Sequence, residues 1–216
     1  MSVVERLVPD TVAVASTRAE LLDGELFDEE RAAVGHAVES RRREFATGRA
    51  CARKALAQLE IAPVAILSGE RGEPIWPDGV VGSITHCAGY RAGAVARAVD
   101  VRSLGIDAEV HRPLSDGVRR EIAFGPERAM LAARRHGIHL DAVLFSAKEA
   151  VYKAWFPLTH RWLGFEDAEL AIDLAAATFH ARLLIPGPII DGEALTGLSG
   201  RWAIEDGIVA AAVIVP

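Results

Sequence analysis

The segment Lys148-Glu149-Ala150-Val151-Tyr152-Lys153 contains two of the three lysines in a chain that uses arginine at 21 positions. Lysine and arginine are not interchangeable, because the ammonium pKa shifts readily and the group can pass on a proton, whereas a guanidinium stays protonated. Apolar periodicity over residues 142–156 predicts a helix here, with Glu149 and Lys153 as i, i+4 neighbours. Taken alone, these two residues are explained by an exposed ion pair that contributes only about 0.3 to 0.5 kcal/mol.

Two acids in alternating positions stand upstream, in Gly105-Ile106-Asp107-Ala108-Glu109. The alternation predicts a strand, in which side chains at i and i+2 point to the same face. Gly105 leaves room for another backbone segment or a ligand to approach that strand closely. An isolated Asp-x-Glu is most simply interpreted as a pair of solvated strand residues, so a site at Asp107 and Glu109 needs a further argument.

Mutual repulsion among three carboxylates supplies that argument. If Glu149 joins Asp107 and Glu109, each pair at ~4 Å repels by roughly 4 kcal/mol at an effective dielectric constant of about 20. The cluster therefore requires a cation. Oxygen ligands without histidine or cysteine favour Mg²⁺, with Mn²⁺ as the alternative, and Mg²⁺ typically keeps waters and binds substrate phosphates. The three acids thus indicate a metal site for a phosphate-bearing substrate.

The rest of the chain alternates irregularly between helix and strand patterns, which indicates an α+β fold. Helical periodicity is clearest over residues 28–59 and 142–156, each with glycine or proline nearby. Asp206-Gly207 lies between β-rich runs and predicts an antiparallel hairpin, because both central residues of such a turn need positive φ. The openings Phe45-Ala46-Thr47-Gly48-Arg49 and Phe145-Ser146-Ala147-Lys148 hint at a duplication. Strand patterns cover residues 11–16, 80–85, 91–99, 104–109, 168–174, 178–185 and 201–215.

Composition excludes several classes of protein. With 216 residues, half of them apolar, the chain can bury about 70% of its unfolded surface. A net charge of −6 argues against nonspecific binding of nucleic acid, which needs a basic face. The apolar run 208–215 is far too short to span a bilayer, and the N-terminus lacks a signal pattern. We therefore expect a soluble cytoplasmic protein. Cys51 and Cys87 fit no metal spacing and are expected to be unreactive.

Gly-x-Asp-x-Glu followed by Lys-Glu-Ala-x-x-Lys resembles the paired signature of the 4′-phosphopantetheinyl transferases, and both motifs match completely. The resemblance extends to residues 71–77 and 82–87 and to Arg41-Arg42-Arg43-Glu44-Phe45 with Arg49, so it covers most of the chain. Length and motif order are similar to the monomeric two-half type, the group that activates surfactin and enterobactin synthetases, and particularly to its actinobacterial members. Enzymes of this type serve peptide, siderophore, polyketide and fatty-acid biosynthesis.

The resemblance implies two similar α+β halves, each a small, mainly antiparallel sheet packed on a long helix. It implies halves at residues 1–108 and 109–216, with coenzyme A bound in the cleft between them. The implied reaction is an Mg²⁺-dependent transfer of 4′-phosphopantetheine from coenzyme A to a serine of apo acyl- or peptidyl-carrier proteins, which releases adenosine 3′,5′-bisphosphate. We expect a monomer that binds neither nucleic acid nor membrane.

Site residues follow from the same resemblance, position by position. Asp107, Glu109 and Glu149 match the metal ligands, and Glu149 also matches the general base for the carrier serine. Lys148 and Lys153 match pyrophosphate contacts, and Lys153 is also a candidate to protonate the departing bisphosphate. Catalysis is thus expected from Glu149, Lys153 and Asp107. The expected coenzyme A contacts are Arg41, Arg49, Arg71, Gly72, Glu73, Thr85, His86, Asp107, Lys148 and Lys153, with Arg41, Arg49 and His86 on the 3′-phosphate.

Ser68 and Glu73 depart from the family, since they stand in a stretch where many relatives offer a lysine. The connecting stretch 111–141 has six arginines against four acids. The resemblance implies that this stretch meets the acidic surface of a carrier protein, where complementary charge would speed the encounter. A solvated helical surface explains the same charges equally well. The arginines are Arg112, Arg119, Arg120, Arg128, Arg134 and Arg135.

Two other functions compete with this interpretation. A metal-dependent phosphohydrolase would use the same acids to activate water, but the chain has neither a G-x-x-x-x-G-K-[ST] loop nor an H-E-x-x-H motif. A noncatalytic module that binds coenzyme A could keep the arginines and His86 and lose the acids. The complete set Asp107, Glu109 and Glu149 argues against such a module.

Overall fold

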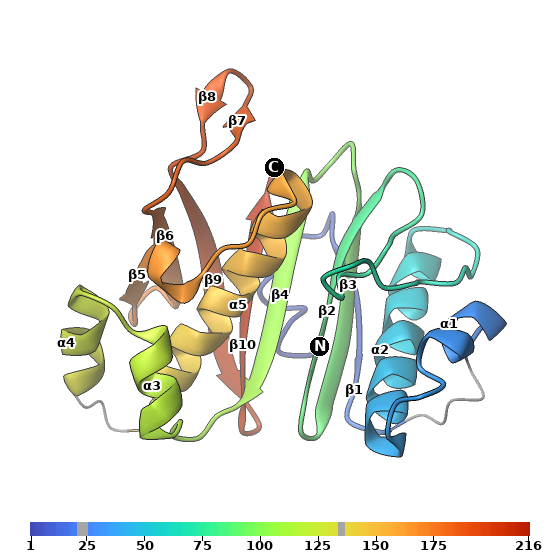
Figure 1. Cartoon of the computed structure of the whole chain (residues 1–216), viewed down its shortest axis with the longest axis horizontal. Coiled ribbons are helices and arrows are strands. Elements are labelled where there is room, and N and C mark those ends of the chain that lie inside the picture. The colour runs from blue at the N-terminus through green and yellow to red at the C-terminus, as the bar shows by residue number, and fades with distance from the viewer. Residues whose placement is uncertain (21–25, 134–136) are drawn as a thin grey trace.

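Two antiparallel sheets, one of three strands and one of five, each pack against one 20-residue helix (Figure 1). The computed structural model describes residues 1–20, 26–133 and 137–216. Its helices are α1 (Asp28–Ala33), α2 (Glu39–Gln58), α3 (Asp116–Ile122), α4 (Pro126–Ala132), α5 (Leu140–Thr159) and a short 3₁₀ helix at Phe165–Asp167. Its strands are β1 (Ala13–Thr17), β2 (Val80–Cys87), β3 (Tyr90–Arg97), β4 (Ser103–Val110), β5 (Ala168–Asp173), β6 (Thr178–Leu183), β7 (Ile189–Ile190), β8 (Glu193–Ala194), β9 (Gly197–Glu205) and β10 (Ile208–Val215).

The smaller sheet has the strand order β1-β3-β2 and packs against α2. Gly93 in β3 makes the close packing possible, because a Cβ atom there would come within 2.7 Å of the backbone of Ala52 in α2. The helical pattern over residues 28–59 corresponds to two helices, α1 and α2, rather than one. The break between them contains Gly35, a residue that weakens a helix interior.

The larger sheet has the strand order β4-β10-β9-β6-β5 and packs against α5. Gly105 in β4 has the role that Gly93 has in the smaller sheet. A Cβ atom at Gly105 would collide with the carbonyl oxygen of Ala150 and come within 2.6 Å of the amide nitrogen of Ala154. The glycine of the Gly-x-Asp-x-Glu motif therefore admits the backbone of α5, which carries the other motif.

The predicted C-terminal hairpin is confirmed. Asp206 and Gly207 connect β9 to β10 with φ values of 48° and 75°, the positive values that a two-residue turn of this kind needs. β10 then pairs with β4 along the whole length of both strands, from Ile208 opposite Val110 to Val215 opposite Ser103. The hairpin thus holds the acidic strand β4 in the larger sheet.

β2 and β4 join the two halves, although they belong to different sheets. The Ser83 hydroxyl oxygen accepts the backbone N–H of Ile106 at 3.1 Å, and the Thr85 hydroxyl oxygen accepts that of Ala108 at 2.9 Å. Side-chain oxygens thus take the place of backbone carbonyls along this seam, and the two strands run parallel. Both strands are visible at the centre of Figure 1.

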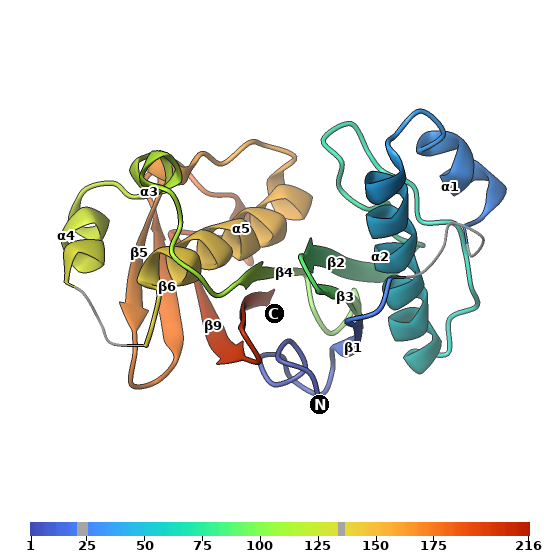
Figure 2. The ribbon, with the colours of Figure 1, turned by 90° about the horizontal axis from the view of Figure 1, so that it is seen from below.

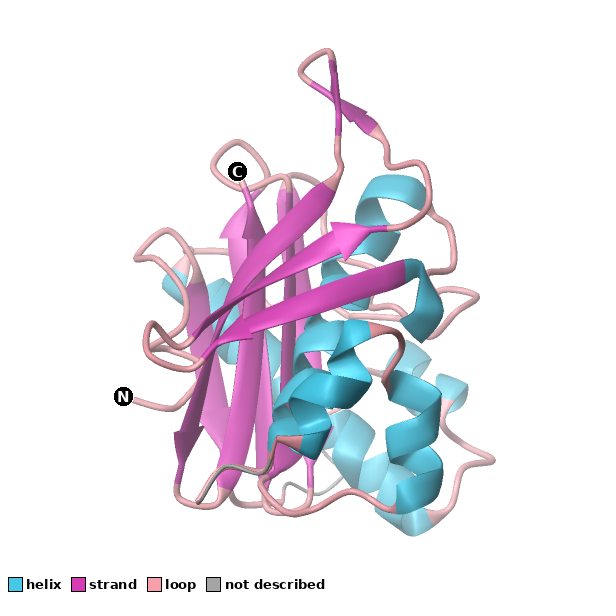
Figure 3. Cartoon of the chain, turned by 90° about the vertical axis from the view of Figure 1, so that its left-hand side faces the viewer, coloured by secondary structure: helices cyan, strands magenta, loops and turns pink. Residues whose placement is uncertain are grey.

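α2 and α5 lie on the same side of the sheets, and the N-terminal segment lies on the other side (Figure 2). A view from the side shows most of the helices on one side of the strands (Figure 3). The expected α+β fold with two halves is confirmed. The expected boundary between residues 108 and 109 stays a prediction, and both residues lie within β4. Of the helices described, none combines the length and apolar character needed to cross a membrane.

Candidate active site

A cavity of about 340 Å³ opens between α2, β2, β4 and α5. We call it the central cavity. It brings together Arg41, Arg49, Gly72, His86, Asp107, Glu109, Glu149 and Lys153 from the residues identified in the sequence. The remaining lining residues are Glu44, Phe45, Gly48, Pro74, Ile84 and Phe145. Basic groups from α2 and β2 therefore face the same space as acidic groups from β4 and α5.

Asp107 and Lys153 form an ion pair on the wall of this cavity. Lys153 Nζ lies 2.7 Å from Asp107 Oδ1 and also donates to the carbonyl oxygen of Ile106 at 3.2 Å. The Thr85 hydroxyl donates to the same Oδ1 at 3.3 Å. Asp107 is only 5% exposed, and its second oxygen, Oδ2, is buried without a hydrogen-bond partner among the described residues. A buried carboxylate oxygen of this kind needs a further donor or a cation.

The other two acids are held in a state that favours protonation. Burial raises the pKa of Glu109 to about 7, and the charges of Asp107 and Glu149 add to the rise. Burial also raises the pKa of Glu149, with Asp107 acting in the same direction and Lys153 opposing it. These shifts are the expected signs of desolvated carboxylates that repel one another. The single ammonium of Lys153 offsets the repulsion only in part.

The acids fit an added cation. No group of three His, Cys, Asp or Glu side chains is already arranged to hold a metal ion among residues 1–20, 26–133 and 137–216. The unpartnered Oδ2 of Asp107 and the raised pKa values of Glu109 and Glu149 nevertheless mark carboxylates whose mutual repulsion a bound cation would relieve. Carboxylate oxygens are the ligands that Mg²⁺ prefers. The assignment of Asp107, Glu109 and Glu149 as metal ligands stays a prediction.

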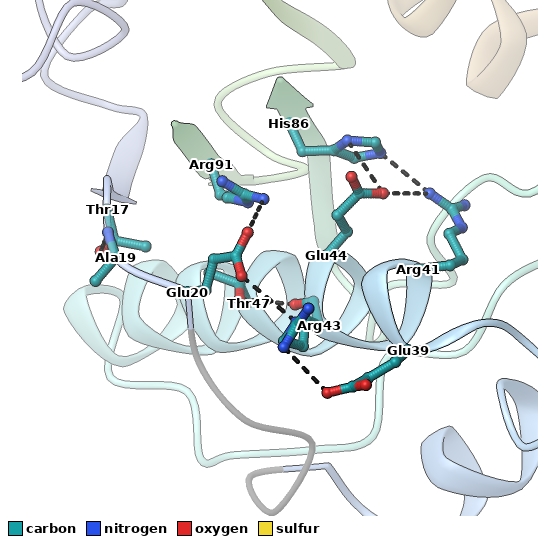
Figure 4. Close-up of polar contacts among 10 residues, drawn as sticks. All are labelled: Thr17, Ala19, Glu20, Glu39, Arg41, Arg43, Glu44, Thr47, His86 and Arg91. Carbon is teal, nitrogen blue, oxygen red and sulfur yellow. Dashed lines mark hydrogen bonds and ion pairs between the residues drawn. The ribbon is translucent and has the colours of Figure 1, made fainter. Parts of the chain in front are cut away.

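Arg41, Glu44 and His86 form a compact cluster at the basic end of the central cavity (Figure 4). Arg41 Nη1 lies 3.2 Å from His86 Nε2, and Glu44 Oε2 lies 3.7 Å from Arg41 Nη1 and 3.8 Å from His86 Nδ1. Burial lowers the pKa of His86, while Glu44 acts in the opposite direction. The same close-up shows Glu20, which follows β1, between Arg91 of β3 and Arg43 of α2.

Arg49 is fixed on three sides beside this cluster. Its Nε donates to the carbonyl oxygen of Ile66 at 3.1 Å, and its Nη2 donates to the Ser68 hydroxyl at 2.9 Å. The guanidinium carbon lies 3.8 Å from the centre of the Phe45 ring. Burial lowers the pKa of Arg49 to about 10. Ser68, which departs from the family pattern, therefore helps to hold Arg49.

A second cavity of about 450 Å³ adjoins the central cavity, and the two share Gly72, Pro74, Ile84, Glu149 and Lys153. We call it the adjoining cavity. Its wall includes Arg71 and Glu73 from the loop before β2. Glu73 Oε2 accepts the backbone N–H of Arg71 at 2.9 Å, so this carboxylate is engaged with its own loop.

Two family models match the chain. The model described as the 4′-phosphopantetheinyl transferase N-terminal domain covers residues 29–96, and that of the 4′-phosphopantetheinyl transferase superfamily covers residues 103–190. The 4′-phosphopantetheinyl transferase Npt of Nocardia iowensis is 47% identical over 218 aligned residues, which span 97% of this chain and 98% of the relative. The chain belongs to the 4′-phosphopantetheinyl transferase family.

Two further relatives support membership of this transferase family. The 4′-phosphopantetheinyl transferase Svp of Streptomyces mobaraensis is 56% identical over 193 residues, covering 88% of this chain and 78% of the relative. The 4′-phosphopantetheinyl transferase PptT of Mycobacterium tuberculosis is 50% identical over 191 residues, covering 86% and 84%. The predicted resemblance to actinobacterial members is confirmed.

Lys148 of this transferase does not lie on the wall of the central or the adjoining cavity. Its Nζ donates to Glu127 Oε2 at 2.8 Å and to the carbonyl oxygen of Phe165 at 2.6 Å, and its side chain is 2% exposed. Burial lowers the pKa of Lys148, and Glu127 opposes the shift. The expected pyrophosphate contact of Lys148 stays a prediction, and its ammonium is here engaged by Glu127 and Phe165. Thr85 is likewise buried behind the cavity wall, where it binds Asp107.

Glu127 and Glu30 were not identified from the sequence, yet each ties a short helix to the motif-bearing helix of its half. Each accepts the backbone N–H of a phenylalanine three residues earlier, Phe124 or Phe27. Glu30 also pairs with Arg53 of α2 at 2.7 Å, as Glu127 pairs with Lys148 of α5. Both stand in the sequence as Phe-x-x-Glu, in which the glutamate can accept the backbone N–H three residues earlier, as the glutamate of a capping box does.

Proposed function

We propose that this protein transfers the 4′-phosphopantetheine group of coenzyme A to a serine of apo acyl- or peptidyl-carrier proteins and releases adenosine 3′,5′-bisphosphate. The observation that carries the proposal is the composition of the central cavity. One end contains Arg41, Arg49 and His86, and the other contains the acids with Lys153. A ligand with a terminal phosphate and a pyrophosphate some distance away would match both ends.

The basic end would bind the 3′-phosphate of coenzyme A. Arg41 and Arg49 offer charged N–H donors, and arginine is well suited to a phosphate because its donors form a planar fork. The anchoring of Arg49 by Ile66 and Ser68 orders its guanidinium before any ligand arrives. The adjoining cavity, with Arg71 and Gly72 on its wall, would take the rest of the nucleotide.

The acidic end would bind the pyrophosphate together with Mg²⁺. Asp107, Glu109 and Glu149 would hold the ion. When bound, the ion would neutralise charge on the phosphoryl oxygens while the pyrophosphate bond breaks and the phosphoester bond to serine forms. Lys153 would contact the pyrophosphate from the same wall, because its ammonium already faces the cavity beside Asp107. These residue roles rest on the family motifs and on the shared cavity.

The chain's own residues would move the protons of the reaction. Glu149 would accept the proton of the carrier serine hydroxyl, which is a weak nucleophile until a base removes it. The serine oxygen would form a bond to the phosphorus that carries pantetheine, and the bond from that phosphorus to the bisphosphate oxygen would break. Lys153 would then give a proton to the departing bisphosphate.

A third cavity of about 170 Å³ also borders Glu149 and suits the pantetheine arm. Besides Glu149, Lys148 and Gly164, it is lined by the apolar and aromatic side chains Val151, Tyr152, Trp162, Leu163, Phe165 and Ala168. The arm is uncharged and narrow, so a mainly apolar cavity beside the base would accommodate it, while most of the charged groups lie in the central cavity. A place for the arm next to Glu149 is consistent with attack at the phosphorus that bears it.

Carrier proteins would dock on α3, α4 and the segments around them. Arg119, Arg120 and Arg128 border a shallow cavity there together with Asp116. Arg119 is paired with Asp116 at 3.7 Å and with Asp141 at 3.7 Å, so part of its charge is already neutralised. Arg134 and Arg135, also expected on this surface, lie outside the described residues.

We further propose that the protein acts as a cytoplasmic monomer with Mg²⁺ or Mn²⁺ and binds no nucleic acid.

Incubation with coenzyme A, Mg²⁺ and a panel of apo carrier domains tests the function through the intact mass of each carrier. We expect at least one carrier to gain one phosphopantetheine group on its serine, and a serine-to-alanine carrier to gain none. Loss of coenzyme A without any modified carrier would instead support a phosphohydrolase. Binding of coenzyme A without loss or transfer would support a noncatalytic module.

A further inference from the structure

In the cluster of Arg41, Glu44 and His86, each side chain contacts the other two. A guanidinium has only donors, so His86 Nε2, at 3.2 Å from Arg41 Nη1, must be the acceptor. The ring proton of His86 then resides on Nδ1, which faces Glu44 Oε2 at 3.8 Å. The same Oε2 lies 3.7 Å from Arg41 Nη1 (Figure 4). One carboxylate therefore faces both groups that are expected to bind a phosphate.

The side chain of Glu44 lines the central cavity, although Glu44 also lies on the surface of α2. It lines the central cavity together with Arg41, Arg49 and His86, and its side chain is 33% exposed. Glu39, one turn earlier on α2, differs in both respects. Its side chain is 69% exposed, it pairs with Arg43 at 3.0 Å, and it is absent from the lining of the central cavity.

We propose that Glu44 is a specificity-determining residue, a resident carboxylate that competes with the 3′-phosphate for Arg41 and His86 and so limits how tightly the bisphosphate product is held. This inference rests on the proposed function, because it assigns the 3′-phosphate to that end of the cavity. In the free enzyme the carboxylate offsets one of the two guanidinium charges, those of Arg41 and Arg49, at the basic end. A 3′-phosphate must displace it from Arg41 and His86 or bind beside it.

The sign of the effect follows from charge. A phosphate monoester carries close to two negative charges above neutral pH. Even if His86 gains a proton when the phosphate binds, the site gains about one net negative charge next to Glu44. That charge is repelled by the carboxylate, so removal of the carboxylate tightens binding. A ligand without a 3′-phosphate brings no charge to this end, and its affinity should not change.

The opposite role for Glu44 makes the opposite prediction. If Glu44 served only to orient Arg41 and His86, replacing its carboxylate would loosen both groups and weaken the binding of a 3′-phosphate. Glutamine keeps the length and shape of glutamate and removes the charge. The direction of the change in Glu44→Gln therefore separates competition from orientation.

Calorimetric titration of wild type, Glu44→Gln and the matched control Glu39→Gln with adenosine 3′,5′-bisphosphate and with adenosine 5′-monophosphate tests the inference. We expect Glu44→Gln to bind the bisphosphate roughly threefold to tenfold more tightly at low salt, since the charges are partly exposed and screened. Binding of the monophosphate should be unchanged, and Glu39→Gln should match wild type with both ligands. In the transfer reaction, Glu44→Gln should lower both the inhibition constant of added bisphosphate and the KM of coenzyme A, because both ligands carry the 3′-phosphate.

Equal or weaker binding of the bisphosphate by Glu44→Gln, with wild type still preferring it over the monophosphate, would overturn the inference and leave the proposed function standing. Equal tightening in Glu39→Gln would also overturn it, because the effect would then come from the general charge of α2. If wild type did not prefer the bisphosphate at all, the 3′-phosphate assignment itself would be wrong, and the inference with it.

Discussion

Lys153 Nζ lies 2.7 Å from Asp107 Oδ1, so the ammonium of one motif neutralises the first acid of the other. The contact crosses from α5 to β4, and Gly105 permits it by letting the helix backbone approach the strand. Glu149 lies one helical turn before Lys153, on the same face of α5. The proposed base and the proposed acid are thus held on one rigid element against the proposed metal ligands.

Replacement of Lys153 by arginine should remove most of the transfer rate, although the positive charge is kept. A guanidinium is larger and planar, and it holds its proton too tightly to give it to the departing bisphosphate. The initial rate of carrier modification, followed by intact mass, measures the effect. Lys54 is an exposed lysine on α2, so Lys54→Arg is the matched control and should leave the transfer rate nearly unchanged. If Lys153→Arg had a kcat close to that of wild type, Lys153 would not be the general acid, and only its role in binding phosphate would remain.

Asp107→Ala should abolish transfer and uncouple coenzyme A binding from Mg²⁺. The substitution removes the unpartnered Oδ2 that the metal is expected to use, while the basic end of the central cavity is left intact. Calorimetric titration with coenzyme A in the presence and absence of Mg²⁺ checks this. Wild type should bind more tightly when Mg²⁺ is present, and the variant should bind equally in both conditions. An unchanged Mg²⁺ dependence in the variant would exclude Asp107 from the metal site.

Lys148→Met should destabilise the fold, because it leaves Glu127 buried without its cation. Breaking a buried pair by removing one partner typically costs about 3 to 5 kcal/mol. Urea denaturation gives the free energy of unfolding directly. The double variant Lys148→Met, Glu127→Gln should recover part of the loss, because no unpaired buried charge remains. A small change in stability with a large rise in the KM for coenzyme A would instead support a direct pyrophosphate contact.

Binding of adenosine 3′,5′-bisphosphate should take up protons near pH 7.5. Burial lowers the pKa of His86, so its ring is neutral in the free protein at that pH. A phosphate beside it favours the charged form and raises the pKa again, which draws a proton from the buffer. Titrations in two buffers of different ionisation enthalpy report the number of protons. His86→Asn should show a smaller uptake, and equal uptake in both proteins would mean that another group titrates.

The parts of the fold with a strong local signal could be predicted from the sequence. Asp206-Gly207 marked a hairpin, because few residues adopt the positive φ values that such a turn needs. The same dipeptide at Asp191-Gly192 connects β7 to β8, with φ values of 51° and 85°, yet it was not predicted. Its strands have only two residues each, too few to show a periodic pattern.

The direction of each side chain was harder to predict than the position of its motif. Lys148 and Glu149 are neighbours in one motif, but successive residues of a helix point about 100° apart. Glu149 therefore lines the central cavity while Lys148 turns toward Glu127. The seam through Ser83 and Thr85 was also beyond prediction, because side-chain bonding between strands of different sheets has no sequence period.

The most direct test of the account counts both products of the reaction. Wild type and Glu149→Gln are incubated with coenzyme A, Mg²⁺ and an apo carrier, and modified serine and released adenosine 3′,5′-bisphosphate are quantified together. The proposed mechanism predicts equal amounts of the two products with wild type, and neither product with Glu149→Gln, which should still bind coenzyme A. Release of bisphosphate by wild type without modified carrier, or full transfer by Glu149→Gln, would contradict it.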